Sequence, residues 1–554
     1  DRLRSRGLGD VYKRQVEGLL SMAVLKDKCL PQTTHQRIEH IHESLLFYDE
    51  HTFGASESVS DPLCENSQVQ WGEKSAYAWE AVKRTQMLYE TSVGLLQGDL
   101  RRGKNPTLTI FNTLNWKRSE MLTVYIDFEV IPRNQFFEIT DFQGHSLKVQ
   151  PIRYRREGCY YAIFAEDIPP MGYKTFEIVF KQPSTDTGTI TINNASIENH
   201  FYKLQLNPDK GTIQSLYDKE LNCELVDSSS PWELGAFIYE KLGNRDQLAQ
   251  YRLDDYNRTG LSECRIIDSS NGPIYQRILL QGKSPGTDEA FGVNLEIKLY
   301  HDTKRIELEY AIKRLPETDP SGIYVAFPFQ LPEGKLAFDV QGGTVISGKN
   351  QLEGTSTDWN TVQNFVSVQN NQAQIIIGSS LIPLYQLGDI NLGKFQYQKQ
   401  YERPHVYSWV MNNYWNTNFK ASQEGEFRWS YHLTSSVDPS SNLATKFGWS
   451  SRIPLYARVM PTGTENHKPT EYSAFHFEKD NFLMTSCTPS KEEGYILLNI
   501  REIDGKRTNL RILNEDGQTI PFTIVNAIEE KLENETSEHI FEGYQNKFIK
   551  IKRF

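Results

Sequence analysis

The sequence is poor in cysteine, has no excess of positive charge and has no long apolar run, and each absence excludes a class of protein. Its 554 residues include six scattered cysteines and no CxxC spacing, so no disulfide framework is indicated. The net charge of -11 argues against a nucleic-acid partner, because phosphate binding requires concentrated lysine and arginine. No run approaches the ~20 apolar residues that span a bilayer, so we expect no membrane partner.

The start of the chain also lacks features of a natural N-terminus. It opens DRLRSRGLGDVYKRQ, with neither an initiator methionine nor the apolar stretch of a signal peptide. A helical pattern is already under way at VEGLLSMAVLKD, directly afterwards. We therefore expect residues 1–15 to be a non-native extension and the natural gene to continue upstream.

Hydrophobic periodicity predicts an α+β protein, mostly β, with several units. Residues 16–104 carry apolar residues at helical spacing and predict a bundle of three helices. From residue 105 the period changes to two, which predicts a small β-domain over 105–182. Residues 189–436 hold many strand patterns without alternating helices, so one large antiparallel sandwich is expected. Residues 437–554 predict a small C-terminal β-domain.

The segment LLFYDEHTFGA combines acidic and imidazole side chains at the end of a predicted helix. Asp49, Glu50 and His51 are adjacent there, and Gly54 follows. Carboxylate and imidazole groups together suit a divalent metal or the hydroxyls of a sugar. The alternative is that His51 only caps the helix, where a cation interacts favourably with the helix dipole.

A second polar segment, NNYWNTNF, follows a predicted strand of the large sandwich. Asn412, Asn413 and Asn418 offer amide groups, and Trp415 offers a flat ring that can stack on a sugar. These four residues are therefore candidate substrate-binding residues. The same residues are explained equally well if the segment is only an asparagine-rich turn beside core aromatic residues.

Several motifs in the same order resemble glycoside hydrolase family 38 α-mannosidases. DEHTFGA resembles the end of the catalytic region in a bacterial branch of that family. TLTIFNTLNWKR and IENHFYKLQLN resemble the entries to its first and its large β-domain. YVAFPFQL, GTSTDWNTVQNFV and NNYWNTNF are also similar to family segments. Together the resemblance spans about residues 30 to 436.

The resemblance implies a retaining, exo-acting α-mannosidase that hydrolyses terminal α-mannosyl linkages of glycans. It implies a large supersandwich of the galactose-mutarotase type and a zinc ion bound by two histidines and two aspartates. His51 would be one zinc ligand, with Asp49 and Glu50 contacting the sugar or orienting the histidine. The location of the protein stays open, with the bacterial cytoplasm favoured because any export signal would lie upstream, and a homo-oligomer stays open as well.

The chain departs from the family pattern in its zinc motif. The early His-x-Asp motif is missing, and the nearest pattern is the adjacent pair His301-Asp302 in the sandwich region. We therefore expect the nucleophile and the acid/base to lie upstream. This chain alone would then be inactive and would not bind zinc.

Two other functions remain open from the sequence. The first is a non-catalytic carbohydrate-binding sandwich protein, which predicts no metal and a natural start near residue 16. The second is a polysaccharide lyase, for which His405, Tyr407 and Asn412 are the candidate residues. The lyase hypothesis leaves DEHTFGA unexplained.

Overall fold

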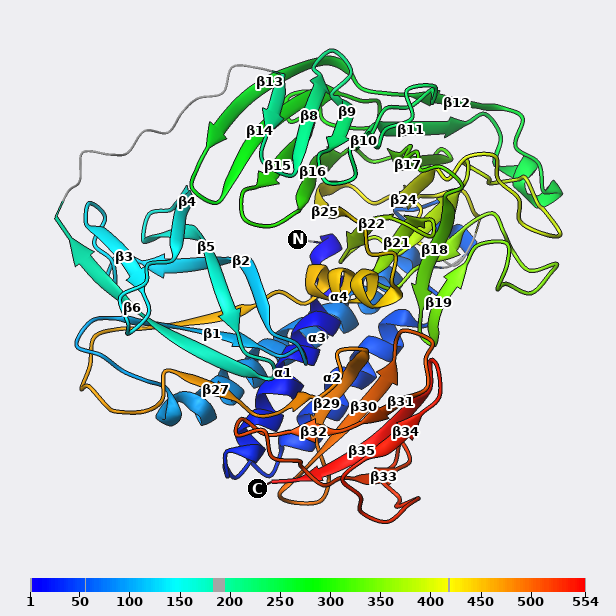
Figure 1. The fold of residues 1–554 in the computed structure, drawn as a ribbon. Helices are drawn as coiled ribbons and strands as arrows, with labels where there is room; N and C mark the ends of the chain where they lie inside the picture. Colours follow the sequence, from blue (N-terminus) through cyan, green and yellow to red (C-terminus); the bar gives the residue numbers. More distant parts are fainter. Residues whose placement is uncertain (1, 55, 183–194, 417–418, 554) are drawn as a thin grey trace.

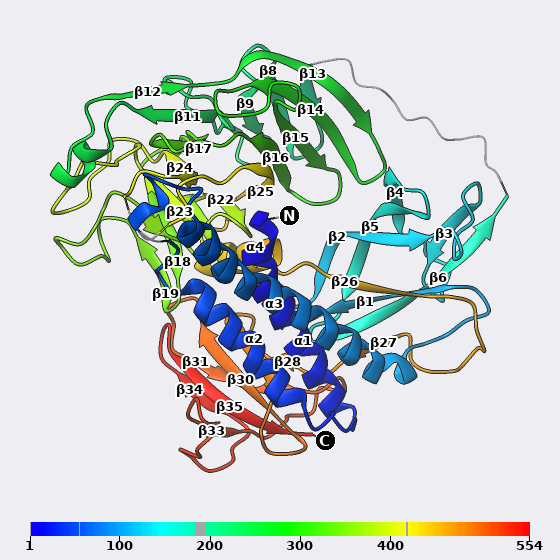
Figure 2. The ribbon, with the colours of Figure 1, turned by 180° about the vertical axis from the view of Figure 1, so that it is seen from behind.

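Long helices form the centre of the fold, and β-sheets surround them on three sides (Figures 1 and 2). The computed structural model describes residues 2–54, 56–182, 195–416 and 419–553 of the chain. Of the helices in these described ranges, none combines the length and the apolar character needed to cross a bilayer.

The three helices that the apolar spacing predicts are present as α1 (Arg2–Leu25), α2 (Thr34–Asp49) and α3 (Glu65–Leu96). Short 3₁₀ turns, η1 (Ser56–Ser58) and η2 (Gln97–Asp99), follow α2 and α3. Helix α1 lies against α3 on one side and against the C-terminal strands on the other, so its residues 15–25 are buried. Helix α3 crosses the molecule diagonally from the large sandwich to the small β-domain (Figure 2).

Helix α1 does not begin at residue 16, because residues of the expected extension continue the same helix. Two of them contact distant parts of the chain. Gln15 Nε2 donates a hydrogen bond of 2.6 Å to the Pro454 carbonyl, and the Arg14 guanidinium donates to the Thr485 carbonyl.

The small β-domain consists of two antiparallel sheets. Its strands are β1 (Thr107–Asn112), β2 (Arg118–Asp127), β3 (Phe136–Thr140), β4 (Lys148–Tyr154), β5 (Gly158–Ile168) and β6 (Gly172–Lys181). One sheet has the order β2-β5-β4, and the other is built on β1 and β6.

Residues 437–554, expected as one terminal domain, are divided between three places in the fold. Helix α4 (Ser441–Arg452) packs on the large sandwich, and β26 (Tyr456–Met460) and β27 (Glu471–Ser473) then join the small β-domain. Strand β26 pairs with β1, with Thr107 opposite Met460. Strand β1 is buried at every position, and without β26 one of its edges would lack hydrogen-bond partners.

The large sandwich is formed by sheets of four, six and nine strands. Its strands are β7 (Ser196–Glu198), β8 (Tyr202–Asn207), β9 (Thr212–Asp218), β10 (Cys223–Glu224), β11 (Phe237–Leu242), β12 (Tyr256–Thr259), β13 (Ser262–Asn271), β14 (Tyr275–Lys283), β15 (Val293–Tyr300), β16 (Ile306–Arg314), β17 (Ser321–Phe327), β18 (Lys335–Val340), β19 (Gly343–Ile346), β20 (Asn360–Thr361), β21 (Phe365–Gln369), β22 (Gln374–Ser379), β23 (Leu384–Leu387), β24 (Val406–Asn412) and β25 (Gly425–Ser436). One 3₁₀ turn, η3 (Arg245–Gln250), follows β11.

Every strand pair found in the described part of 189–436 is antiparallel, and no α-helix connects two of its strands. The predicted mostly-β architecture with a large antiparallel sandwich is therefore confirmed. Alternating apolar residues of facing sheets fill its core, which is the largest in the molecule.

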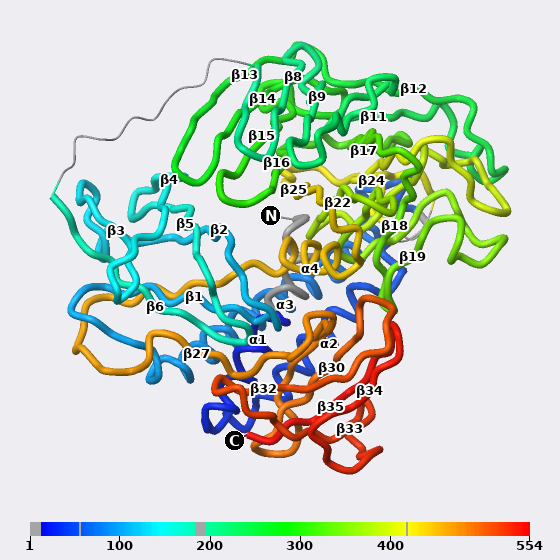
Figure 3. Tube along the Cα trace, in the orientation of Figure 1, coloured from blue at the N-terminus to red at the C-terminus, as the bar shows by residue number. Residues whose placement is uncertain are grey.

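The remaining C-terminal strands pack against α1 and α2 (Figure 3). They are β28 (His476–Phe477), β29 (Phe482–Pro489), β30 (Tyr495–Glu502), β31 (Thr508–Leu510), β32 (Ile512–Leu513), β33 (Thr523–Val525), β34 (His539–Phe541) and β35 (Asn546–Lys552). Their main sheet has the order β29-β30-β35-β33.

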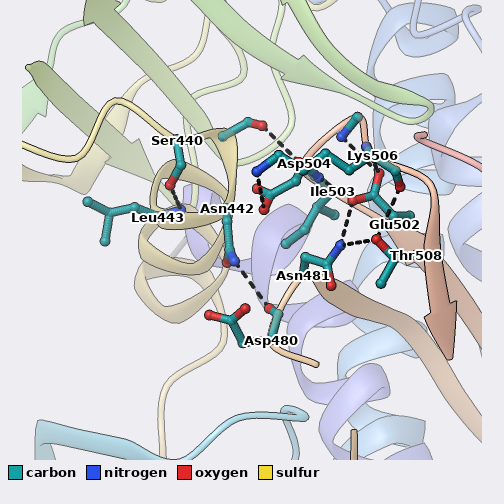
Figure 4. Close-up of polar contacts among 12 residues, drawn as sticks. Ser440, Asn442, Leu443, Asp480, Asn481, Glu502, Ile503, Asp504, Lys506 and Thr508 are labelled. Carbon is teal, nitrogen blue, oxygen red and sulfur yellow. Dashed lines mark hydrogen bonds and ion pairs between the residues drawn. The ribbon is translucent and has the colours of Figure 1, made fainter. Parts of the chain in front are cut away.

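Buried Glu502 organises the contact between this C-terminal domain and α4 (Figure 4). Its carboxylate accepts hydrogen bonds from the Asn481 side chain at 2.8 Å and from the backbone N–H groups of Asp504 and Gly505. Asn442 of α4 donates to the Asp480 carbonyl beside it. Since all these bonds are internal, Glu502 stabilises a turn and is not available to a ligand.

Candidate functional site

A cleft of about 390 Å³ lies between the C-terminal end of α2 and the end of β24. The helix side contributes Tyr48, Asp49, Glu50, His51 and Phe53, and the sandwich side includes Arg314, Glu317, Ser321, Asn412, Asn413 and Lys420. The cleft therefore brings together five of the seven residues that the sequence singles out, although the two segments are far apart in the chain.

The end of α2 is held by a lysine of the neighbouring helix. Lys74, on α3, is buried and donates hydrogen bonds to the carbonyls of Phe47 (2.7 Å) and Glu50 (2.6 Å). A cation at this position satisfies the unpaired carbonyls of the last turn and opposes the helix dipole. The capping role that the sequence offers to His51 therefore belongs to Lys74.

Glu50 is held in its ionised form. Its carboxylate accepts hydrogen bonds from the Thr52 hydroxyl (2.9 Å), the Lys74 ammonium (3.1 Å) and the Thr52 N–H (3.1 Å). These donors, the Thr52 hydroxyl foremost, lower the pKa of Glu50 to about 2. An ionised carboxylate at neutral pH is a strong acceptor for sugar hydroxyl groups.

His51 lies at the mouth of the cleft, with its side chain 83% exposed. Its Nδ1 lies 2.8 Å from Glu50 Oε1, which fixes the ring when Nδ1 carries the proton. Nε2 then presents a lone pair toward solvent, the arrangement that a carboxylate imposes on metal-binding histidines. Across the described residues there is no group of three or more His, Cys, Asp or Glu side chains that could hold a metal ion. The described residues can therefore supply one ligand of a zinc site, His51, and not the complete set of ligands.

Gly54 allows the two walls of the cleft to approach each other. A Cβ at this position would lie 2.7 Å from the carbonyl oxygen of Phe419 and 3.2 Å from the indole nitrogen of Trp71. Any larger residue would push the loop after α2 away from the sandwich.

Asn412 and Asn413 are adjacent but have different roles. Asn413 is buried, and its amide is fully used: Oδ1 accepts from the Ser321 N–H (2.7 Å), and Nδ2 donates to the carbonyls of Glu317 (3.1 Å) and Ala421 (3.0 Å). Asn413 therefore holds the loop closed. Asn412 is half-buried and makes no side-chain hydrogen bond with another described residue, so its amide can bind a ligand.

Of the other two candidates of this segment, Trp415 does not line the cleft. Trp415 is 39% exposed and packs with Trp359 and Trp409, at ring-centroid distances of 5.7 and 5.8 Å. Asn418 lies outside the described residues.

Arg314 is a cleft residue that sequence analysis missed. It is 8% exposed, its Nη2 donates to the Ser321 hydroxyl at 2.7 Å, and its Nη1 has no hydrogen-bond partner. Burial lowers the pKa of its guanidinium. Because its position at the end of a regular sandwich strand carries no sequence signal, only the fold places it in the cleft.

The residues of the lyase hypothesis do not form an open site. His405 and Tyr407 are each 3% exposed, and His405 Nε2 lies 2.9 Å from Asp227 Oδ2. Burial raises the pKa of Tyr407 to about 12, so its phenol stays protonated at neutral pH and cannot accept a proton as a base. Neither residue lines the cleft that Asn412 lines.

Comparisons with known proteins agree with the architecture. Residues 197–395 match the model of the glycosyl hydrolases family 38 C-terminal domain. An α-mannosidase from Enterococcus faecalis V583 has a similar structure, with a TM-score of 0.74 and 13% identity, over 100% of this chain and 67% of its own. A glycosyl hydrolase family 38 protein from Enterococcus faecalis matches with the same TM-score and identity, over 99% of this chain and 70% of its own. No curated protein matches the chain in sequence.

The chain is therefore similar to family 38 α-mannosidases, in sequence over residues 197–395 and in fold over its whole length. The resemblance that the sequence motifs indicate is confirmed. A glycoside hydrolase is the protein class with which this similarity is consistent.

Proposed function

We propose that the chain is the C-terminal part of a retaining, exo-acting α-mannosidase and that the cleft binds the terminal mannose of a glycan. One observation carries the proposal: the Glu50–His51 pair, which directly follows α2, and the unpaired amide of Asn412 line one cleft. Glu50 accepts hydroxyl hydrogens, Asn412 can donate and accept, and Arg314 offers a buried donor. Convergent polar groups of this kind orient a polyhydroxylated ligand.

We further propose that zinc is bound in the intact enzyme, with His51 as one of its ligands. The exposed Nε2 and the carboxylate behind Nδ1 support this role. Since the described residues supply no group of three ligands, the others would come from a separate segment. Zinc supplies Lewis-acid contact to substrate hydroxyls when it is bound.

The nucleophile and the acid/base are proposed to lie in that same separate segment. The outward faces of α2 and α3 and the segment between them support a docking partner, because large apolar side chains are exposed there: Leu46 (72%), Phe47 (51%), Leu63 (81%) and Met87 (59%). In this proposal the chain alone does not hydrolyse aryl α-mannosides. Robust turnover by the purified chain would contradict it.

The binding proposal is tested with the chain as it is. Titration with methyl α-mannoside, followed by ligand-observed NMR, should show binding that His51→Ala and Asn412→Ala each weaken severalfold. His145→Ala is the matched control, because His145 is also exposed (78%) and its Nδ1 lies 2.9 Å from a carboxylate, that of Asp141, in the small β-domain. Equal effects of His51→Ala and His145→Ala would contradict a sugar site at the cleft.

The alternative function, a non-catalytic carbohydrate-binding protein, predicts the same result for the methyl α-mannoside titration. The two hypotheses differ for the intact protein, because the alternative predicts that it contains no zinc. Elemental analysis of the full-length protein separates the two functions: His51→Ala should lower the zinc content if His51 is a ligand. Unchanged zinc content and activity would leave His51 without a metal role.

A further inference from the structure

The cleft continues into a second hollow of about 260 Å³ on the side of α3. The two hollows share Tyr48, Phe53, Lys420 and Gln423, so they are two ends of one trough. The first end contains the polar groups Glu50, His51 and Arg314. The second end, which we call the aromatic end, is lined in addition by Gln68, Trp71, Gly72, Ser75, Ala78 and Trp79 of α3.

The floor of the aromatic end is formed by small residues of one helix. Gly72 and Ser75 lie one turn apart on α3, and Trp79 follows one turn later on the same face. A Cβ added to Gly72 would meet no atom within 4 Å, so the space above it is open. Trp79 is 50% exposed at the end of this row, and its ring can therefore contact a ligand.

Trp71 lines this end with its ring and is 7% exposed. Its indole nitrogen is covered by protein atoms and lies beside Gly54. The Lys420 ammonium lies 5.0 Å from the centre of the Trp71 ring, so the ring is held between the helix and the sandwich loop.

We propose that the aromatic end is a second sugar-binding subsite, which takes the residue next to the terminal sugar of an α-linked oligosaccharide. Aromatic faces with nearby amide groups suit a pyranose, which has an apolar face and hydroxyl edges. The amide of Gln423 makes no hydrogen bond with another described residue and lies where both ends of the trough meet. This inference rests on the proposed function, which assigns the first end to the terminal sugar.

The test compares a monosaccharide with disaccharides on the same chain. Dissociation constants are measured for methyl α-mannoside and for α-1,2-, α-1,3- and α-1,6-linked mannobiose. At least one mannobiose should bind about tenfold more tightly than methyl α-mannoside, a gain of about 1.4 kcal/mol. Gly72→Leu should fill the subsite and reduce this affinity ratio to near one, and Trp79→Ala should reduce it severalfold.

Gly94→Leu is the matched control. Gly94 lies on the same helix, and a Cβ there also meets no atom within 4 Å, but it does not line the trough. Both leucine variants should be at least as stable as the parent, because leucine favours an exposed helix position more than glycine does. Gly94→Leu should therefore leave the affinity ratio unchanged.

The two proposals fail in different ways. If methyl α-mannoside does not bind, the proposed function fails and the subsite fails with it. If methyl α-mannoside binds but no mannobiose binds more tightly, the subsite alone is overturned. It is also overturned if Gly72→Leu and Gly94→Leu give the same ratio as the parent.

Discussion

The ammonium of Lys74 lies 3.1 Å from the carboxylate of Glu50 and also donates to the carbonyl of the same residue at 2.6 Å. One buried cation on α3 thus fixes both the end of α2 and the charge of the cleft. Since His51 is in turn oriented by Glu50, the position of the imidazole depends on a residue that is itself outside the cleft.

Replacing Lys74 with methionine should damage stability and binding together. Two carbonyls of the last turn of α2 would lose their donor, at a cost of about 1–3 kcal/mol of unfolding free energy. Chemical denaturation measures this loss, and the methyl α-mannoside titration measures the effect on the cleft. Lys83→Met is the control, because Lys83 is 67% exposed and pairs only with Glu80 on the surface of the same helix. Similar losses in both variants would refute the capping role.

The low pKa of Glu50 predicts a binding activity that resists acid. A carboxyl with its pKa lowered from 4.5 to about 2 stays ionised as the pH falls through 4.5, and it is protonated only near pH 2. Its stabilising contribution is therefore full above pH 4.5 and is lost between pH 4.5 and 2. A pH titration of the Glu50 carboxyl carbon by NMR measures this directly. A midpoint near 4.5 would contradict the hydrogen-bonding pattern.

Tyr414 should position the loop that carries the sandwich side of the cleft. Its buried hydroxyl donates to Glu240 at 2.5 Å, and a Cβ on Gly322 would lie 2.1 Å from that hydroxyl oxygen. Gly322→Ala should therefore displace Tyr414 and weaken sugar binding, with a loss of stability of about 1–3 kcal/mol. Tyr414→Phe removes the hydrogen bond but keeps the ring, so it should cost stability with a smaller effect on binding. Unchanged binding in Gly322→Ala would exclude this positioning role.

The low pKa of His432 predicts how the free energy of unfolding changes with pH in mild acid. Burial is the main cause that lowers its pKa to about 3, opposed by Glu307 and assisted by Arg305 and Lys298. Between pH 6.5 and 3 the unfolded chain binds a proton that the folded chain does not. As the pH is lowered through this range, the free energy of unfolding should therefore fall by up to about 1.4 kcal/mol per pH unit from this group alone.

Urea unfolding at a series of pH values checks the contribution of His432. His432→Gln, which has a side chain of similar size without a titrating ring, should flatten the dependence between pH 6.5 and 4. An equally steep dependence in this variant would show that other groups are responsible.

Part of the fold and of the site could be predicted from residue patterns alone. Apolar residues at helical spacing predicted the helices, and alternation predicted the antiparallel strands, because each period places one row of side chains on one face. The DEHTFGA and NNYWNTNF segments drew attention to residues that the structure brings into one cleft. The first helix spans Arg2–Leu25, and residues 437–554 are shared among three parts of the fold; neither feature follows from a local pattern.

The sequence by itself determined which elements form and which side chains carry suitable chemistry, because both follow from residue type and short-range spacing. Only the tertiary structure decided how those side chains are used. It gave Lys74 the capping role offered to His51, and it paired β26 with β1 across more than half of the chain. It also separated two adjacent asparagines, since consecutive residues at the end of a strand point to opposite sides. Asn413 therefore closes the loop through three internal hydrogen bonds, while Asn412 keeps its amide for a ligand.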